Sequence, residues 1–150
     1  MQMRRSQVLL RMPVDHVVAQ MISHDGEKSD VLLFIPPTED IGRVLSQGAA
    51  FLPVVKAGAM CVLARDTIAC IAIPELPVIP REDDLPVQTQ AAIVTLRSGA
   101  TVEGELRFTA PEGQQRTADF LNDSDPIFVV HGTATAFHVV KAHVAKVEEK

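Results

Sequence analysis

The sequence predicts an all-β protein built from two tandem, repeat-related modules of five short strands each. Three observations lead to this prediction: the second half of the chain repeats the pattern of the first, β-rich runs alternate with turn signals, and helical segments are hard to place. The repeat is clearest in two blocks that keep one offset of 76 positions, residues 45–54 with 121–130 and residues 61–71 with 137–147. Such a repeat is typical of two copies of one small module packed together.

The strands of the first module are bounded by turn residues. The first clear strand, residues 17–22, ends at Asp25-Gly26, which is a hairpin signal because both positions tolerate positive φ. The next strand, residues 30–35, stops at Pro36, since proline cannot donate to a strand ladder. Three further strands are expected over residues 51–55, 59–64 and 68–73.

The second module repeats this order. A strand over residues 93–96 leads through a turn at Gly99 to residues 101–108, which alternate polar and apolar side chains as a half-exposed strand does. Pro111 closes this strand. Three further strands are expected over residues 127–130, 136–140 and 143–147.

A less regular stretch interrupts each module, over residues 40–48 and 114–125. Within the second stretch, residues 116–122 fit either one helical turn or an irregular strand. Near the start of the chain, residues 7–10 fit either a helix or a first strand. The sequence leaves both alternatives open.

Prolines mark the boundary between the modules. Four of the ten prolines lie between residues 74 and 86, a composition that predicts a stiff, extended linker. We therefore expect a first module over residues 1–75, a linker over residues 76–85 and a second module over residues 86–150. Five short strands left open would expose two edges, so closure of each module into a small barrel is the economical arrangement, although the sequence does not decide closure.

Composition limits the classes of function. The chain has 47% hydrophobic residues and a net charge of -5, which is typical of a globular protein with no electrostatic reason to follow a phosphate backbone. No apolar signal core follows the N-terminus and no window approaches a membrane-spanning length, so we expect a soluble, cytoplasmic protein. The six phenylalanines lie in apolar runs and are expected in the core. Cys61 and Cys70 are expected to be core thiols, and residues 60–63 a buried strand.

The sequence contains no motif that predicts catalysis. A nucleophile elbow, a phosphate loop, a dinucleotide fingerprint and a CxxC pair are all missing from it. His138 and His143 flank the last turn, but spacing places no third metal ligand beside them. We therefore expect no enzymatic activity, no metal and no cofactor.

Two segments of the second module resemble a known family. Residues 94–106 are similar to the opening of an Sm-like (LSm) domain, with a strand, a glycine turn and a second strand broken by glycine, and residues 137–147 are similar to its closing strand pair. The resemblance covers residues 91–149 directly and residues 15–74 through the repeat. It implies a small five-stranded barrel. RNA binding in that family uses an Asn in a loop and an Arg-Gly turn, whereas the turn here is Lys141-Ala142.

Two arginines are candidate site residues. Arg43 and Arg116 occupy similar places in the two copies, each just before a matched leucine. One interpretation is structural, with each arginine anchoring its loop to backbone carbonyls or to a carboxylate such as Asp40 or Asp119. The other interpretation is functional: the arginines, with Asp119 and Asn122 beside them, make pseudo-symmetric contacts to an anion or a partner at the module interface.

These observations favour a non-enzymatic protein-interaction or assembly module that forms a homo-oligomer or binds a protein partner, without a membrane. The alternative is an Sm-like RNA or nucleotide-binding protein that uses arginines such as Arg97, Arg107 and Arg116. An enzyme is the third hypothesis.

Overall fold

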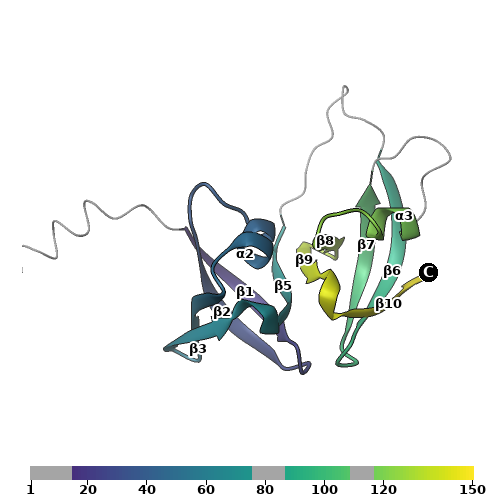
Figure 1. The fold of residues 1–150 in the computed structure, drawn as a ribbon. Helices are drawn as coiled ribbons and strands as arrows, with labels where there is room; N and C mark the ends of the chain where they lie inside the picture. Colours follow the sequence, from purple (N-terminus) through teal and green to yellow (C-terminus); the bar gives the residue numbers. More distant parts are fainter. Residues whose placement is uncertain (1–14, 76–86, 109–116) are drawn as a thin grey trace, which may run out of the picture.

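Ten antiparallel strands form one sheet in the computed structural model, which describes residues 15–75, 87–108 and 117–150 (Figure 1). Along the sheet the strands follow the order β10-β6-β7-β8-β9-β5-β1-β2-β3-β4. The prediction of an all-β protein is therefore confirmed. The strands are β1 (Asp15–Ser23), β2 (Lys28–Ile35), β3 (Phe51–Lys56), β4 (Ala59–Ala64), β5 (Ile68–Pro74), β6 (Gln88–Leu96), β7 (Thr101–Phe108), β8 (Ile127–His131), β9 (Thr135–Val140) and β10 (Val144–Glu149).

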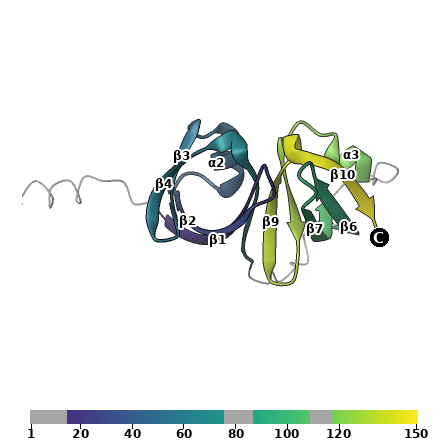
Figure 2. The same cartoon turned by 90° about the horizontal axis from the view of Figure 1, so that it is seen from below.

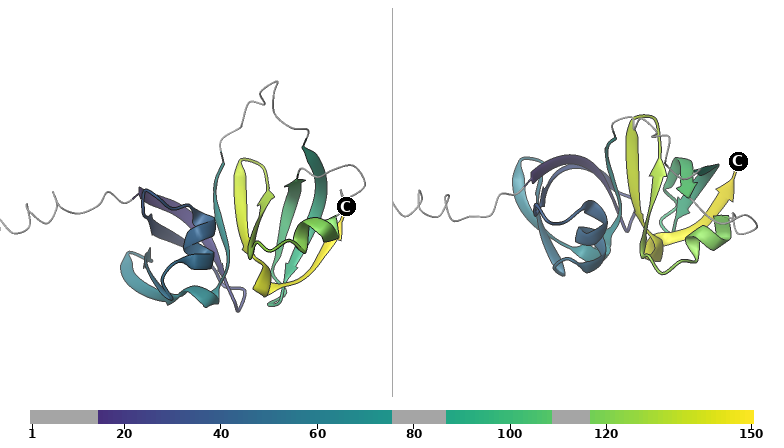
Figure 3. Two further views of the ribbon diagram at one scale, coloured as in Figure 1. Left: turned by 45° about the horizontal axis from the view of Figure 1, so that its top comes forward. Right: turned by 90° about the horizontal axis from the view of Figure 1, so that it is seen from above.

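The two halves of the sheet have matching strand orders. The first half reads β5-β1-β2-β3-β4 and the second reads β10-β6-β7-β8-β9, so each strand has a counterpart five places later in the chain. The halves lie side by side, and each curls around its own interior (Figures 2 and 3). The predicted hairpin at Asp25-Gly26 joins β1 to β2, with Gly26 at a φ of +90°.

The described strands make one open sheet rather than two closed barrels. Its edges are β10 and β4. In the second half, β9 pairs with β5 of the first half instead of with β10, and in the first half the outer side of β4 pairs with no described strand. The predicted linker over residues 76–85 and the undecided segment at residues 7–10 lie outside the described residues, so the module boundaries stay a prediction.

A short α-helix follows the second strand of each half: α2 (Ile41–Gln47) in the first and α3 (Thr117–Leu121) in the second. Asp40 caps α2, because its Oδ1 accepts a hydrogen bond from the Arg43 N–H at 2.8 Å. Both helices lie in the stretches predicted to be irregular, and α3 decides the open alternative in favour of a helical turn. One-turn 3-10 helices, η1 (Arg65–Thr67) and η2 (Lys141–His143), follow β4 and β9.

The two apolar cores exchange residues where the halves meet. Ile127 of β8 packs in the core of the first half, while Ile22 of β1 and Ala69 and Cys70 of β5 pack in the core of the second. Ile71 of β5 points the other way, into the first core. Each half therefore completes the interior of the other, and burial at this junction stabilises both.

Candidate functional site

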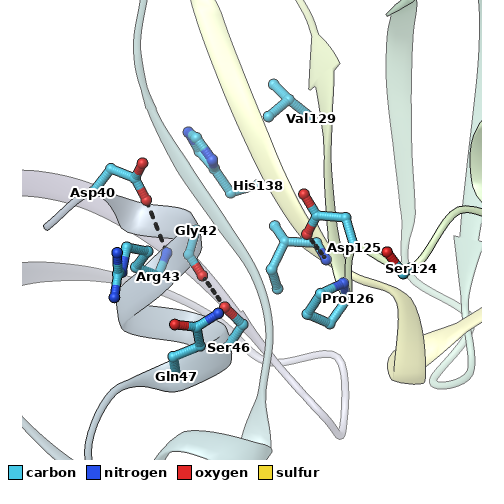
Figure 4. Close-up of a pocket in the computed structure, with 11 residues that line it drawn as sticks. Asp40, Gly42, Arg43, Ser46, Gln47, Ser124, Asp125, Pro126, Val129 and His138 are labelled. Atoms are coloured by element: carbon cyan, nitrogen blue, oxygen red, sulfur yellow. Dashed lines mark hydrogen bonds between the residues drawn. The ribbon is translucent and has the colours of Figure 1, made fainter.

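A pocket lies between α2 of the first half and strands β8 and β9 of the second (Figure 4). Its volume is about 570 Å³. Arg43, one of the predicted site residues, lies on its α2 side. The lining residues are Asp40, Gly42, Arg43, Ser46, Gln47, Ser124, Asp125, Pro126, Ile127, Val129 and His138.

Several polar groups of this pocket hydrogen-bond the local backbone. Asp40 caps α2, and the Ser46 hydroxyl donates to the Gly42 carbonyl at 2.7 Å. The Asp125 Oδ1 accepts from the Ile127 N–H at 3.0 Å. These hydrogen bonds fix the conformation of the segments around the pocket. The polar groups that make them do not converge on one point of the pocket as the groups of a reactive site do.

His138 lies half-buried on the β9 side of the pocket. Burial lowers the pKa of His138, which favours the neutral imidazole; nearby Asp40 and Glu75 act to raise the pKa and His131 to lower it. Its Nε2 is buried and has no hydrogen-bond partner among the described residues.

The structure does not bring the predicted site residues together. Arg116 lies outside the described residues. Asp119 and Asn122 are exposed on and after α3, and neither lines the pocket beside Arg43. The helix α3 is held elsewhere, because Phe120 stacks on Phe108 with ring centroids 5.2 Å apart. Of the four predicted residues, Arg43 alone is among the described residues that line the pocket between the halves.

Two arginines of the alternative hypothesis are engaged by neighbouring groups. The Arg97 Nε donates to the Ala142 carbonyl at 2.8 Å. Arg107 lies 3.5 Å from the Glu105 carboxylate and 3.8 Å from that of Glu75. Arg97 therefore satisfies one of its donors on the backbone, and Arg107 lies beside two carboxylates that offset its charge.

Strands β5 and β9 form the junction between the halves, from Cys70 opposite Val139 to Pro74 opposite Thr135. A side-chain contact extends it, since the Glu75 carboxylate lies 2.8 Å from the Nδ1 of His131. The sequence repeat does not predict this pairing. The repeat matches strands in the same place of each half, whereas the pairing joins the fifth strand of one half to the fourth strand of the other.

The outer side of β4 pairs with no strand of the described residues. Met60 and Val62 on β4 are 61% and 62% exposed, and Phe51 on the adjacent β3 is 62% exposed. We call these three residues the β4 edge patch. The prediction of a core position for Phe51 is wrong, and the predicted buried strand over residues 60–63 is buried on one face alone: Cys61 and Leu63 pack partly buried against the first core, whereas Met60 and Val62 lie on the outer face, which no element of the described residues covers. The sequence gives no signal of this exposure, because residues 59–64 carry no charge and resemble a buried strand.

The backbone of β4 also presents polar groups outward. In an antiparallel pair, successive residues point their N–H and C=O alternately toward and away from the partner. The Arg65 N–H donates to the Ala50 carbonyl at 2.8 Å, and Pro53, which has no N–H, stands opposite Val62. This alternation places the N–H and C=O groups of Met60 and Val62 on the outer side, where another strand can pair with them.

Comparison with protein-family models, with curated proteins and with solved structures gives no match. Among the described residues, no group of three or more His, Cys, Asp and Glu side chains is placed to hold a metal ion. No helix in the described part of the chain has the length and apolar character needed to cross a membrane.

Proposed function

We propose that the chain is a non-enzymatic protein-interaction or assembly module, and that the β4 edge is its working surface. The observation that carries this proposal is an edge strand whose outer side pairs with no described strand and which presents outward backbone groups and the β4 edge patch of Phe51, Met60 and Val62. Sheet proteins normally protect such an edge, because it is a template for strand addition. Strand addition to an open edge is also a common mode of protein recognition.

The opposite end of the sheet supports this interpretation by contrast. Strand β10 carries Lys146, Glu148 and Glu149, and Lys146 pairs with Glu148 at 2.7 Å. Charges of this kind on an edge strand oppose pairing with another chain. Within the described sheet, one edge is therefore protected by charge and the other carries no such protection.

We further propose that the halves are repeat-related, Sm-like modules joined by a proline-rich linker. Besides the strand order, a matching irregularity supports this: the register shifts between Ile22 and Ser23 where β1 meets β5, and between Val144 and Lys146 where β10 meets β6. In this interpretation β5, the last strand of the first module, covers β9, the fourth strand of the second module. The fourth strand of the first module, β4, is the equivalent surface left for a partner.

The test is capture of partners by the tagged full chain from an extract of the cells that express it. Val62→Lys places a charge on the β4 edge. Val18→Lys is the matched control, since Val18 is 70% exposed but lies on β1, in the middle of the sheet between β5 and β2. We expect the wild type and Val18→Lys to retain the same protein, which can be a second copy of the chain, and Val62→Lys to lose it.

Circular dichroism establishes that both variants are folded before the comparison is made. The same captured proteins with all three chains would contradict the proposal. Nucleic acid retained at low salt and removed by nuclease would instead favour the Sm-like RNA or nucleotide-binding alternative.

A further inference from the structure

We propose that the partner at the β4 edge is a second copy of this chain. In the proposed two-fold symmetric dimer, the two β4 strands pair antiparallel and Cys61 faces its counterpart across the axis. This inference rests on the proposed function of the β4 edge as an interaction surface, and it adds the identity and the register of the occupant.

A head-to-tail arrangement, in which β10 of one copy covers β4 of the next, is opposed by charge. In the junction inside the chain, Cys70 and Ala72 of β5 are buried where they stand opposite Val139 and Phe137. Shifted by the repeat of 76 positions, the corresponding residues of β10 are Lys146 and Glu148. Repeating the junction would bury this exposed ion pair in an apolar interface, at a desolvation cost that their attraction does not reliably recover.

Pairing of β4 with β4 meets no such obstacle. The strand contains no charged residue, so neither copy brings an unpaired charge to the interface. Centred on Cys61, the pairing sets Met60 of each copy opposite Val62 of the other, and it unites the two exposed apolar patches on one face. The contact is isologous and uses each β4 edge once, so it closes at two copies and leaves the charged β10 edges outside.

The backbone fits this register. Met60 and Val62 point their N–H and C=O groups outward, so they form the hydrogen-bonded pairs between copies. Cys61 then occupies a non-hydrogen-bonded pair, in which Cα atoms of directly opposed residues lie about 4.5 Å apart. That separation is within the range that a disulfide spans.

The second cysteine provides a control inside the molecule. Cys70 is fully buried at the junction, and burial raises the pKa of its thiol to about 12, which keeps it protonated and unreactive. Cys61 is free and partly exposed on the edge strand. Rapid crosslinking of the folded protein therefore reports on Cys61.

The experiment is size-exclusion chromatography with light scattering on the pure full chain, followed by oxidation with copper phenanthroline and a non-reducing gel. We expect a dimer in the wild type and in Val18→Lys, and loss of the dimer in Val62→Lys. We expect a covalent dimer on oxidation of the wild type and of Cys70→Ala, and none with Cys61→Ala. The wild-type crosslink needs no substitution at the edge, so it tests the register even where Val62→Lys fails to fold.

A monomeric wild type would overturn the inference, as would a dimer that Cys61 does not crosslink. After either result the proposed function would still stand if the wild type captured a different protein and Val62→Lys lost it. Conversely, a dimer that Cys61 crosslinks would support the inference. If Val62→Lys still captured the same other proteins as the wild type, the β4 edge would join copies of this chain and would not recognise those proteins.

Discussion

Strands β4 and β9 hold the same place in the two halves, yet only β9 is covered. Val62 on β4 is 62% exposed, whereas its counterpart on β9 is the half-buried His138, and the next residue, Val139, is fully buried. Strand β5 lies beside β9, and no described strand lies beside the outer side of β4. At equivalent places in the two strand orders, burial therefore depends on the strand that lies beside the position and not on the strand itself.

Strands β5 and β10 hold the same place in the two halves, yet β5 pairs with a strand of the other half and the outer side of β10 pairs with no described strand. On its outer face β5 presents Cys70 and Ala72, which are small and apolar, and β10 presents Lys146 and Glu148 at the corresponding places. A small apolar face lets the second half pack closely, while charges keep their hydration and keep the edge open.

The largest effect on stability is expected when Cys70 of β5 is replaced by lysine, the residue at the corresponding place of β10. Cys70→Lys buries a charge at a position that is fully buried, and we expect the free energy of unfolding to fall by about 3–5 kcal/mol. The measurement is urea unfolding followed by far-ultraviolet circular dichroism, since the chain has no Trp or Tyr. The reciprocal Lys146→Cys, at an exposed position, should change stability by no more than about 0.5 kcal/mol. Equal effects of the two substitutions would show that β5 and β10 are not distinguished in this way.

The sequence predicted the features that depend on neighbouring residues. The Asp25-Gly26 turn and most strands follow from local turn chemistry and β-rich runs, and the structure has them. Helix α2 was missed because seven residues are too few for periodicity to show. The β4 edge was missed for a different reason: an uncharged apolar run looks the same whether a strand covers it or not. Covering depends on the pairing of β5 with β9, which joins residues about half a chain apart.

The sequence offered candidate site residues but not their grouping in space, for a related reason. Arg43 was singled out from the pattern shared by the two halves of the sequence, and the structure places it at the pocket between the halves. Asp119 and Asn122 are near Arg116 in sequence, but α3 is anchored through Phe120 away from that pocket. Equivalent residues of two similar units lie close together only where the symmetry axis that relates the units passes near them. The sequence does not define the position of that axis.

A second difference between the halves lies at Gly104. Strands β2 and β3 pair at residues 31–33, whereas β7 and β8 are paired at Glu105 and His131 alone among the described residues. A Cβ on Gly104 would lie 2.5 Å from the His131 carbonyl oxygen. We expect Gly104→Ala to lower the free energy of unfolding by about 1–3 kcal/mol, because the two strands must separate.

The control for this substitution is Gly42→Ala in α2, which meets no contact closer than 3.4 Å. It should be neutral, or stabilising by about 0.5–1 kcal/mol, because alanine favours the helix. Both values come from urea unfolding at neutral pH. Similar effects at the two glycines would argue against a close approach at Gly104.

A smaller effect is expected at the polar end of the junction. Glu75→Gln weakens the contact of the carboxylate with the His131 Nδ1, and we expect a loss of about 0.5–1.5 kcal/mol in urea unfolding. Glu148→Gln breaks the exposed pair with Lys146 on the uncovered β10 and should cost less than about 0.5 kcal/mol. If both substitutions cost the same, the contact at Glu75 does not help to join the halves.

The smallest effect at neutral pH, and the most specific, is expected when His138 receives the residue of its counterpart, Val62. Burial lowers the pKa of His138 in the folded protein below its ordinary value of about 6.5. Above that value both folded and unfolded chains hold a neutral ring, so the group adds no pH dependence there. As the pH falls below about 6.5, the unfolded chain takes up the proton first, and stability is lost.

His138→Val should therefore reduce the acid-induced fall in the urea midpoint between about pH 7.5 and pH 5.5. His24→Gln, at an exposed turn, controls for the removal of a histidine as such. An unchanged acid dependence in His138→Val would mean that covering by β5 does not set the protonation of this ring, and that β4 and β9 differ less in their surroundings than their exposures indicate.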